Sequence, residues 1–303
     1  MAVVVTGSAG FIGRAVVAEL IMRGVPVVGV DRRETPAPVA AGHLVLTGDL
    51  LDRDELADAA FETADAVLHL AGCPGVRDDS ADIGRRRARD NVATTARVLA
   101  AVPAHVPVVV TSSSSVYGGT TGAPSEESHP LSPRGGYAMS KVAVEQLCAR
   151  RAAAGGKVTV VRPFTVVGEG QRPDMAVSRW IAAAEAGRPL QVYGSLQRTR
   201  DLTDVREVAR VLALLAEPGR APGGVLNIGT GRPHSLAALV AAVATATGTR
   251  VRTLVTPAAS VEPADTWACT DRLRAVVGFV PRTDLPEVVA RQVAAAHAMA
   301  GAA

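Results

Sequence analysis

The chain has 303 residues, of which 48% are hydrophobic and only 3% aromatic, so small aliphatic side chains must build most of its core. This length fits one large domain or two closely packed domains, and the hydrophobic content excludes a chain that is disordered throughout. The formal net charge is +3, and the basic residues are spread along the chain, which argues against a nucleic-acid-binding protein with its clustered basic surface.

Cysteine usage and hydropathy predict a protein of a reducing, aqueous compartment. The 3 cysteines form an odd, sparse set, and neither they nor the histidines have the spacing of a disulfide framework or a metal site. The N-terminus lacks the basic and apolar regions of a signal peptide, and no apolar run approaches the ~20 residues that span a bilayer. We therefore expect a cytoplasmic protein without a metal ion or a membrane partner.

Strands alternate with helices through the first half of the chain. β-branched runs predict buried strands, and apolar residues at helical spacing predict helices. The expected strands are Val3–Thr6, Val27–Val30, Leu44–Leu46, Ala66–Leu70, Val106–Thr111 and Val158–Arg162. The expected helices cover Phe11–Arg23 and residues 53–61, 85–101 and 137–153. This alternation predicts an α/β fold with a Rossmann-type, doubly wound parallel sheet.

After about Phe164 the alternation becomes less regular, and glycine and proline become frequent. The expected helices are 175–187, 204–216, 235–247 and 284–299, and strand-like pieces lie at 190–193, 225–228 and 251–255. We predict a dinucleotide-binding Rossmann domain over residues 1–165 and a smaller C-terminal α/β substrate lobe over residues 166–303. The boundary is approximate, because segments of the two parts are expected to interdigitate.

Three glycines, Gly7, Gly10 and Gly13, lie between the first strand and the first helix. The first permits a tight turn, the second lets the backbone approach a pyrophosphate, and the third lets the helix pack closely on the strand. Free N–H groups at the start of the helix would hold the phosphates. Asp31 ends the second strand about 20 residues further on, where a carboxylate can hydrogen-bond the adenosine ribose. This context predicts a dinucleotide site rather than an ordinary glycine-rich turn.

The residues after the second strand bear on the choice between NAD and NADP. Asp31 favours NAD, because its carboxylate would repel a 2′-phosphate. Arg32 and Arg33 follow directly, and either could reach such a phosphate. We expect NAD, with NADP as the less favoured alternative.

Hydroxyl side chains gather where the fifth strand ends, over Ser112–Ser115, and open α/β sheets bind ligands at that edge. Tyr137 and Lys141 lie four residues apart on a helix and so share one face. An ammonium beside a phenol lowers its pKa, and so does a nicotinamide cation, which brings the phenol closer to working pH. Ser113 can hold a substrate oxygen while the proton moves. We predict that these three residues are catalytic, rather than part of an ordinary helix surface.

Ordered motifs extend over nearly the whole chain. They are Thr6–Gly13, Asp49–Leu50, His69–Gly72, Asn91, Ser113–Gly118, Tyr137–Lys141, Arg162–Phe164, Gly168–Asp174, Arg200–Val205 and Asn227–Gly231. Together they resemble the extended short-chain dehydrogenase/reductase superfamily, and specifically its branch of NAD-dependent nucleotide-sugar epimerases and dehydratases, in particular the UDP-glucose 4-epimerase type.

The resemblance implies a set of cofactor-binding residues. Asp49 and Leu50 would contact the adenine, Asn91 would support the surroundings of Lys141 through water, and Phe164 would lie beside the nicotinamide. Lys141 would bind the nicotinamide ribose. The whole implied set is Gly7, Gly10, Phe11, Ile12, Gly13, Asp31, Arg32, Asp49, Leu50, Leu70, Ala71, Gly72, Asn91, Tyr137, Lys141 and Phe164.

The resemblance also implies substrate-binding residues, in which Arg200 would contact a nucleotide diphosphate through its guanidinium group. That set is Ser113, Ser114, Tyr137, Thr165, Tyr193 and Arg200.

Three positions depart from the pattern of the family. Ser114 and Ser115 stand where dehydratases of this branch carry an Asp-Glu pair, which argues against removal of water from the sugar. Thr165 stands where an asparagine usually binds the sugar phosphate. Glu262 stands where an arginine usually helps to bind the diphosphate, and a carboxylate there would repel that group. The last two changes point to an unusual substrate.

The leading hypothesis is an NAD-dependent 4-epimerase that acts on a UDP-hexose or UDP-hexuronate through transient oxidation at C4. One alternative is an NAD(P)H-dependent sugar ketoreductase or dehydrogenase of the same fold. Another is a non-catalytic, dinucleotide-binding regulatory protein, although the retention of Tyr137 and Lys141 argues against it. The resemblance further implies a homodimer that pairs helices at 91–101 and 142–154. The arginines at 85–87 and 89 are expected on a solvated helix face, with room for one of them to enter the cleft.

Overall fold

The protein was analysed as a computed structural model that describes residues 2–34, 42–52, 55–75, 78, 80–120 and 122–301. The first two residues of the expected helix 53–61 lie outside the described residues. Among the described residues, no helix is both long enough and apolar enough to cross a membrane.

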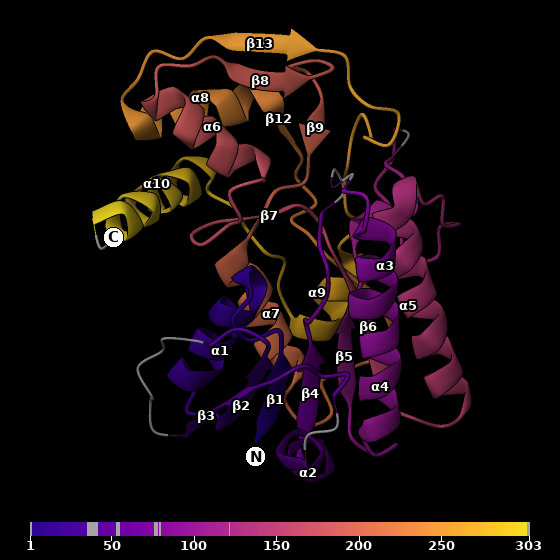
Figure 1. The fold of residues 1–303 in the computed structure, drawn as a ribbon. Helices are drawn as coiled ribbons and strands as arrows, with labels where there is room; N and C mark the ends of the chain where they lie inside the picture. Colours follow the sequence, from indigo (N-terminus) through magenta and orange to yellow (C-terminus); the bar gives the residue numbers. More distant parts are fainter. Residues whose placement is uncertain are drawn as a thin grey trace.

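A seven-stranded parallel sheet forms the lower half of the molecule in Figure 1 and confirms the predicted doubly wound fold. Its strands lie in the order β11-β6-β5-β4-β1-β2-β3. Their bounds are β1 Val3–Thr6, β2 Val27–Asp31, β3 His43–Thr47, β4 Ala66–His69, β5 Val108–Thr111, β6 Val158–Pro163 and β11 Gly224–Ile228. From β1 the sheet continues to β2 and β3 on one side and to β4, β5 and β6 on the other. The strand order therefore reverses between β1 and β4, and sheets of this kind bind ligands at such a point.

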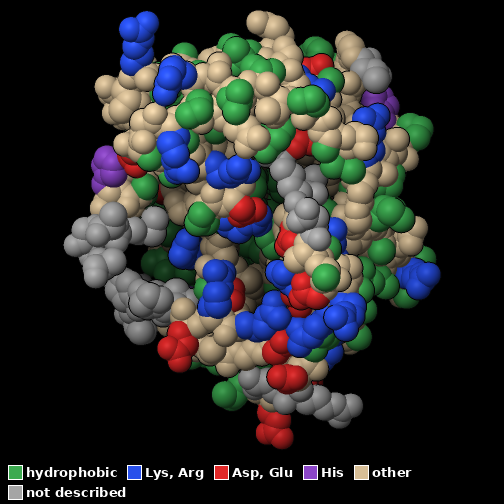
Figure 2. Space-filling view, turned by 45° about the horizontal axis from the view of Figure 1, so that its top comes forward, with side chains coloured by type: hydrophobic (Ala, Val, Ile, Leu, Met, Phe, Trp, Pro, Cys, Tyr) green, Lys and Arg blue, Asp and Glu red, His purple; other side chains and the backbone are tan. Residues whose placement is uncertain are grey.

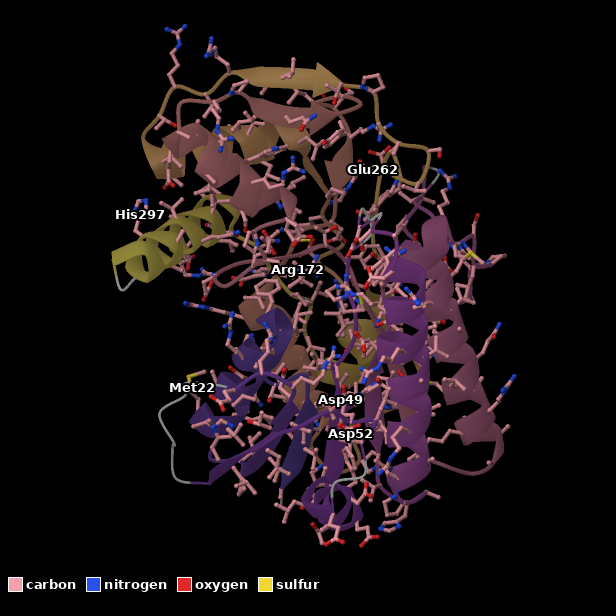
Figure 3. All side chains as sticks on the ribbon, viewed as in Figure 1. Met22, Asp49, Asp52, Arg172, Glu262 and His297 are labelled. Atoms are coloured by element: carbon pink, nitrogen blue, oxygen red, sulfur yellow. The ribbon has the colours of Figure 1, made fainter. Side chains whose placement is uncertain are left out.

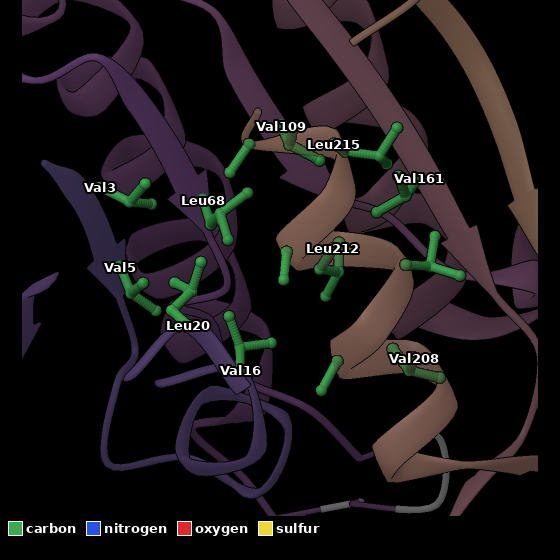
Figure 4. Packing of buried hydrophobic residues seen from close by; sticks show 14 of the residues in the cluster. Val3, Val5, Val16, Leu20, Leu68, Val109, Val161, Val208, Leu212 and Leu215 are labelled. Carbon is green, nitrogen blue, oxygen red and sulfur yellow. The ribbon is translucent and has the colours of Figure 1, made fainter. Parts of the chain in front are cut away.

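Alternating residues of the strands supply two separate hydrophobic layers, one on each face of the sheet. Val3 and Val5 pack with α1 (Phe11–Met22), α7 (Val205–Leu215) and α9 (Asp271–Val277), and Figure 4 shows part of this cluster. Val4 points to the opposite face and packs with residues of α2 (Glu55–Thr63), α4 (Thr94–Ala101) and α5 (Gly135–Ala153). This two-sided burial explains the nearly uninterrupted apolar strands.

Besides α9, two elements from beyond residue 165 belong to the layer that contains α1. β11 pairs with β6, and α7 packs on α1. A short apolar run has the same pattern in either lobe, so the sequence could not place them. The division between residues 165 and 166 therefore stays a prediction, and the chain returns to the sheet after it.

The second lobe lies above the sheet in Figure 1 and has a hydrophobic cluster of its own. Its elements are α6 Ala176–Glu185, β8 Leu190–Tyr193, α8 Leu236–Thr247, β13 Thr253–Thr256 and α10 Leu285–Gly301. Short strand pairs connect it to the sheet: β7 Val166–Val167 with β10 Thr203–Asp204, and β9 Thr199–Arg200 with β12 His234–Ser235.

The helix expected over 85–101 is interrupted. An α-helical turn, α3 (Ile83–Arg87), is followed by a π-helical stretch, η1 (Ala88–Ala93), before α4 begins. Helical periodicity does not reveal such an insertion, because the flanking turns keep their apolar spacing. π-helical turns are frequent at functional sites, and this one carries Asp90 and Asn91, both buried.

We predict that α7 is part of the core that holds the sheet together. Leu212 is 0% exposed in the cluster that α7 shares with α1, so Leu212→Ala should lower the free energy of unfolding by about 2–5 kcal/mol, as for other buried leucines. Denaturant unfolding followed by circular dichroism measures this change. The control is Met22→Ala on α1, where the side chain is 76% exposed. Equal effects of the two substitutions would contradict the placement of α7.

Candidate active site

A cleft of about 1500 Å³ lies between the carboxyl-terminal edge of the sheet and the second lobe. The face shown in Figure 2 is hollowed, with Lys and Arg side chains around the hollow. Arginines from both lobes line the cleft, among them Arg14, Arg172 and Arg200. Figure 3 shows Arg172 where the two lobes meet, with Asp49 on the side of the sheet and Glu262 on the side of the second lobe. Both lobes therefore line the cleft, and its lining contains more basic than acidic side chains.

The structure brings nearly all the residues singled out in the sequence to this one cleft. Asn91 is the exception, since it does not line the cleft. The residues that do so are Gly7, Gly10, Phe11, Ile12, Gly13, Asp31, Arg32, Asp49, Leu50, Leu70, Ala71, Gly72, Ser113, Ser114, Tyr137, Lys141, Phe164, Thr165, Tyr193 and Arg200. Their individual roles stay predictions.

The glycine turn forms the floor of the cleft at the start of α1. Gly7 has φ +71°, and a Cβ atom on it would lie 2.7 Å from the Ala71 amide nitrogen. A Cβ atom on Gly13 would lie 2.0 Å from the Gly7 carbonyl oxygen. Gly10, the N-cap residue of α1, provides no side-chain cap for the first turn of the helix. The helix start therefore presents backbone rather than side chains to the cleft, as phosphate binding requires.

The Asp31 carboxylate is fixed at the end of β2. One of its oxygens accepts a hydrogen bond from the Ala9 amide (3.0 Å), and the other accepts one from the Arg33 amide (2.9 Å). The carboxylate thereby joins the glycine turn to the end of β2 and lines the cleft at the predicted ribose position.

Ser113, Tyr137 and Lys141 meet at the centre of the cleft. Ser113 has extended backbone and begins the 3-10 turn η2 (Ser114–Tyr117), whose Ser115 amide donates to its hydroxyl (3.1 Å). Lys141 lies one turn after Tyr137 on α5, with Nζ 6.0 Å from the centre of the Tyr137 ring. The Lys141 ammonium also donates to the Thr111 carbonyl oxygen at the end of β5 (2.9 Å). The catalytic group expected from the sequence is thus assembled from two elements.

The ionisation of Tyr137 differs from the expectation. Burial raises the pKa of Tyr137, and the neighbouring Ser113 hydroxyl only partly opposes this rise. Burial also lowers the pKa of Lys141 to about 8. In the protein alone, the cost of removing a phenolate from water therefore exceeds the expected stabilisation by Lys141. The expected lowering also relied on the nicotinamide cation, whose charge arrives only with the cofactor.

Asn91 acts on the main chain beside the cleft. It is 1% exposed, and its amide donates to the Cys73 carbonyl oxygen (3.1 Å) and to Ser140 Oγ (2.9 Å). Its carbonyl oxygen accepts from the Cys73 amide (2.7 Å). Asn91 thus ties the segment after β4 to the residue that precedes Lys141. The water-mediated contact with Lys141 stays a prediction.

A buried polar network behind the serine turn was not foreseen. Glu145 accepts hydrogen bonds from Ser112 Oγ (2.6 Å) and from Arg162 Nε (2.9 Å). Arg162 also donates to the Tyr117 hydroxyl (2.8 Å), which in turn donates to Asn227 Oδ1 (2.8 Å). The one sequence signal for it was the position of Glu145, four residues after Lys141 on the same helix.

Arg200 is held at the second-lobe end of the cleft by main-chain carbonyl groups. Its guanidinium donates to the carbonyl oxygens of Thr199 (2.8 Å), Pro263 (2.9 Å) and Ala264 (2.8 Å). The neighbouring Asp201 is 0% exposed and accepts from the amides of Thr230 (2.9 Å) and Gly231 (3.0 Å). These bonds fix the Arg200 segment before any ligand arrives.

One arginine of the expected solvated run is buried. Arg85, Arg86 and Arg89 are exposed, but Arg87 is only 7% exposed. It donates to the carbonyl oxygens of Gly75 (2.6 Å) and Asp78 (3.2 Å). The expectation of a solvated side chain was therefore wrong for Arg87, because its main-chain partners lie in the segment just before α3, and helical spacing does not show how that segment folds back.

The residues present fit a dinucleotide with a polar second ligand. The glycine floor leaves room for phosphates, and Asp31 lines the cleft where the sequence predicts the ribose. Thr111 Oγ1 and Ser115 Oγ line the same cleft and are buried without a hydrogen-bond partner among the described residues. Buried hydroxyl groups normally have partners, so a polar ligand is expected to provide them.

Comparison with known proteins defines the class. The family model described as "NAD dependent epimerase/dehydratase family" matches residues 3–229. The chain belongs to this family, and this confirms both the resemblance and the expected NAD dependence.

Individual relatives match over nearly the full length. A Bacillus subtilis (strain 168) protein described as "Uncharacterized UDP-glucose epimerase YtcB" is 31% identical and covers 97% of both chains. MoeE5, solved with UDP-glucose and NAD, has a TM-score of 0.88 at 38% identity and covers 99% of this chain and 100% of its own. UDP-glucuronic acid 4-epimerase from Bacillus cereus, solved with UDP-glucuronic acid and NAD, has a TM-score of 0.89 at 27% identity, with 99% and 100% coverage.

We predict that the buried Lys141 makes stability rise with pH in the alkaline range. Between the native pKa of about 8 and the ordinary lysine pKa of 10.5, the unfolded chain retains a proton that the native chain has lost. Unfolding then takes up a proton, so the free energy of unfolding increases with pH across this window. Lys141→Met should remove this contribution and give a flatter dependence in denaturant unfolding between pH 8 and 10. The control, Lys157→Met, removes an exposed lysine. A Lys141→Met slope equal to that of the wild type would contradict the burial effect.

Proposed function

We propose that the protein is an NAD-dependent UDP-sugar 4-epimerase that acts on a UDP-hexose or a UDP-hexuronate. The observation that carries the proposal is the assembly of Ser113, Tyr137 and Lys141 in the cleft whose floor is the glycine turn. The ligands of the solved relatives support it, since UDP-glucose in one structure and UDP-glucuronic acid in another are bound together with NAD.

Tyr137 serves as acid and base in this proposal. NAD, when bound, takes up a hydride from C4 of the sugar and returns it. Tyr137 accepts the proton of the C4 hydroxyl during oxidation and gives it back during reduction, while the Ser113 hydroxyl holds the C4 oxygen. Reduction on the opposite face of the 4-keto sugar inverts C4. Lys141, fixed by the Thr111 carbonyl, holds the nicotinamide ribose.

The serines at 114 and 115 favour epimerisation over dehydration. Ser115 Oγ is buried, and its amide is bonded to Ser113, so its main role is to shape the turn. Removal of water from the sugar needs an additional acid and base, and a serine hydroxyl is a poor substitute for a carboxylic acid. Hydride transfer with proton exchange at one oxygen is therefore the reaction that these side chains can complete.

The diphosphate contact is assigned to Arg200 in this proposal. Three main-chain carbonyl groups orient its guanidinium, which lines the cleft, and guanidinium groups suit the recognition of phosphate oxygens. Glu262 lines the same end of the cleft, so both side chains affect the charge that a diphosphate meets there.

We also propose a homodimer located in the cytoplasm. α4 and α5 lie side by side at one edge of the molecule (Figure 1), where Ala96, Ala100 and Met139 are exposed. The two alanine side chains are small and permit close helix packing between subunits. Multi-angle light scattering should give twice the mass of the chain, and the mass of a single chain would contradict the dimer.

We predict that Tyr137→Phe abolishes epimerisation but leaves NAD bound. Loss of the acid–base group should reduce turnover by at least about a hundredfold. The wild type is incubated with UDP-glucose, UDP-galactose, UDP-glucuronate and UDP-galacturonate, and the products are separated by chromatography. Bound NAD is measured after denaturation of each protein.

Interconversion of either sugar pair without consumption of added cofactor supports the proposal. Failure of the NAD-loaded wild type to interconvert any pair would refute the epimerase assignment. Stoichiometric oxidation of added NADH or NADPH would instead identify the ketoreductase alternative. Unchanged turnover in Tyr137→Phe would refute the assigned role of the phenol.

A further inference from the structure

Four charged side chains form a closed ring at the adenosine end of the cleft. Arg32 contacts Asp90 (3.0 Å) and Asp49 (3.7 Å), and Arg89 contacts the same two carboxylates (2.9 Å and 2.7 Å). Positive and negative groups therefore alternate around the ring. The four residues come from the ends of β2 and β3 and from the π-helical stretch η1.

The ring lies where a 2′-phosphate would have to be bound. Arg32 directly follows Asp31, and both line the cleft together with Asp49 and Asp90. The arginine after the ribose-binding carboxylate is well placed to receive the 2′-phosphate that distinguishes NADP from NAD. Its own side chain is 53% exposed, and its ion pairs with Asp90 and Asp49 restrain the guanidinium.

Asp90 is the carboxylate best suited to restrain Arg32. It is the nearer of the two partners, and its side chain is 11% exposed, so the ion pair is partly shielded from solvent. Asp49 is more strongly engaged elsewhere. Burial would raise the pKa of Asp49, but hydrogen bonds from the Leu51 amide and from Arg89 outweigh it and lower the pKa.

The π-helical turn gives Asp90 this position. Asp90 and Asn91 are consecutive, yet both are buried and serve different neighbours. Asn91 bonds to Cys73 and Ser140, while Asp90 faces Arg32 and Arg89. The bonds of Asn91 fix the turn from which Asp90 extends.

We propose that Asp90 is a specificity-determining residue that selects NAD over NADP by holding Arg32 in an ion pair. To bind NADP, the 2′-phosphate would have to displace a carboxylate from Arg32, and it would then lie among Asp31, Asp49 and Asp90. The family match includes NAD dependence but assigns no residue to this choice. The proposal concerns the cofactor only and does not depend on which sugar is bound.

The test measures dinucleotide binding to protein from which bound cofactor has been removed. Isothermal titration with NAD and with NADP gives two dissociation constants for each variant. Asp90→Asn should strengthen NADP binding about tenfold, the effect of a charge-assisted hydrogen bond gained by the phosphate, and should change NAD binding by less than about twofold. Adding Arg32→Ala to Asp90→Asn should abolish the gain, because Arg32 is the group that is released.

The matched control is Asp82→Asn. Asp82 precedes α3 on the same helical segment, its side chain is 50% exposed, and its arginine partner is Arg86 at 3.9 Å. The Asp82→Asn substitution removes the same unit of charge as Asp90→Asn and should leave the ratio of NADP to NAD affinity unchanged. An equal gain in this control, or no gain in Asp90→Asn with NAD binding intact, would overturn the proposal.

A second variant decides the matter if Asp90→Asn does not fold. Arg89 is 45% exposed on its side chain, so Arg89→Ala should be tolerated. Without Arg89, Asp49 and Asp90 share Arg32 as their cation in the ring, and the net charge of the ring becomes more negative. NADP binding should then weaken severalfold relative to NAD. An unchanged or increased relative affinity for NADP would overturn the proposal.

Discussion

The site depends on a close approach of backbone to backbone at the point where the strand order reverses. A side chain on Gly13 would meet the Gly7 carbonyl at 2.0 Å, and one on Gly7 would meet the main chain of Leu70 and Ala71 at less than 3 Å. β1, α1 and the segment after β4 therefore touch without side chains between them. The floor of the cleft therefore depends on this contact between main-chain segments.

The site must also accommodate the buried ammonium group of Lys141 next to the glycine turn. Lys141 has lost most of its water, and His69 nearby is kept neutral, because burial first and Lys141 second lower the pKa of His69 to about 3. Thr6 and Thr95 bond to the two nitrogens of the neutral imidazole, at 2.7 Å and 3.0 Å. The hydrogen-bonded imidazole therefore supports the wall behind Lys141 without adding a second charge there.

Local patterns predicted what depends on neighbours in sequence. The glycine turn, the strand before it and the Tyr137–Lys141 face are set within a few residues, and the sequence identified all of them. The return of β11 and α7 to the sheet and the pairing of Arg32 with Asp90 depend on residues far away in the chain. The burial of Arg87 depends on how the loop just before its helix folds back. The pKa of Tyr137 also escaped prediction, because a helical spacing shows the neighbouring ammonium but not the loss of water. Tertiary contacts and desolvation therefore account for most of the difference between the predicted and the observed structure.

The two ends of the cleft hold their arginines with different groups. At the sugar-nucleotide end, three neutral carbonyl oxygens orient the guanidinium of Arg200. At the adenosine end, Arg32 is paired with carboxylates, which orient and neutralise it together. A guanidinium that is paired with carboxylates must lose one of them before it can bind a phosphate, and the carboxylates that remain would repel that phosphate. The same arginine side chain can therefore attract or reject a phosphate, and at the adenosine end the surrounding carboxylates decide which of the two occurs.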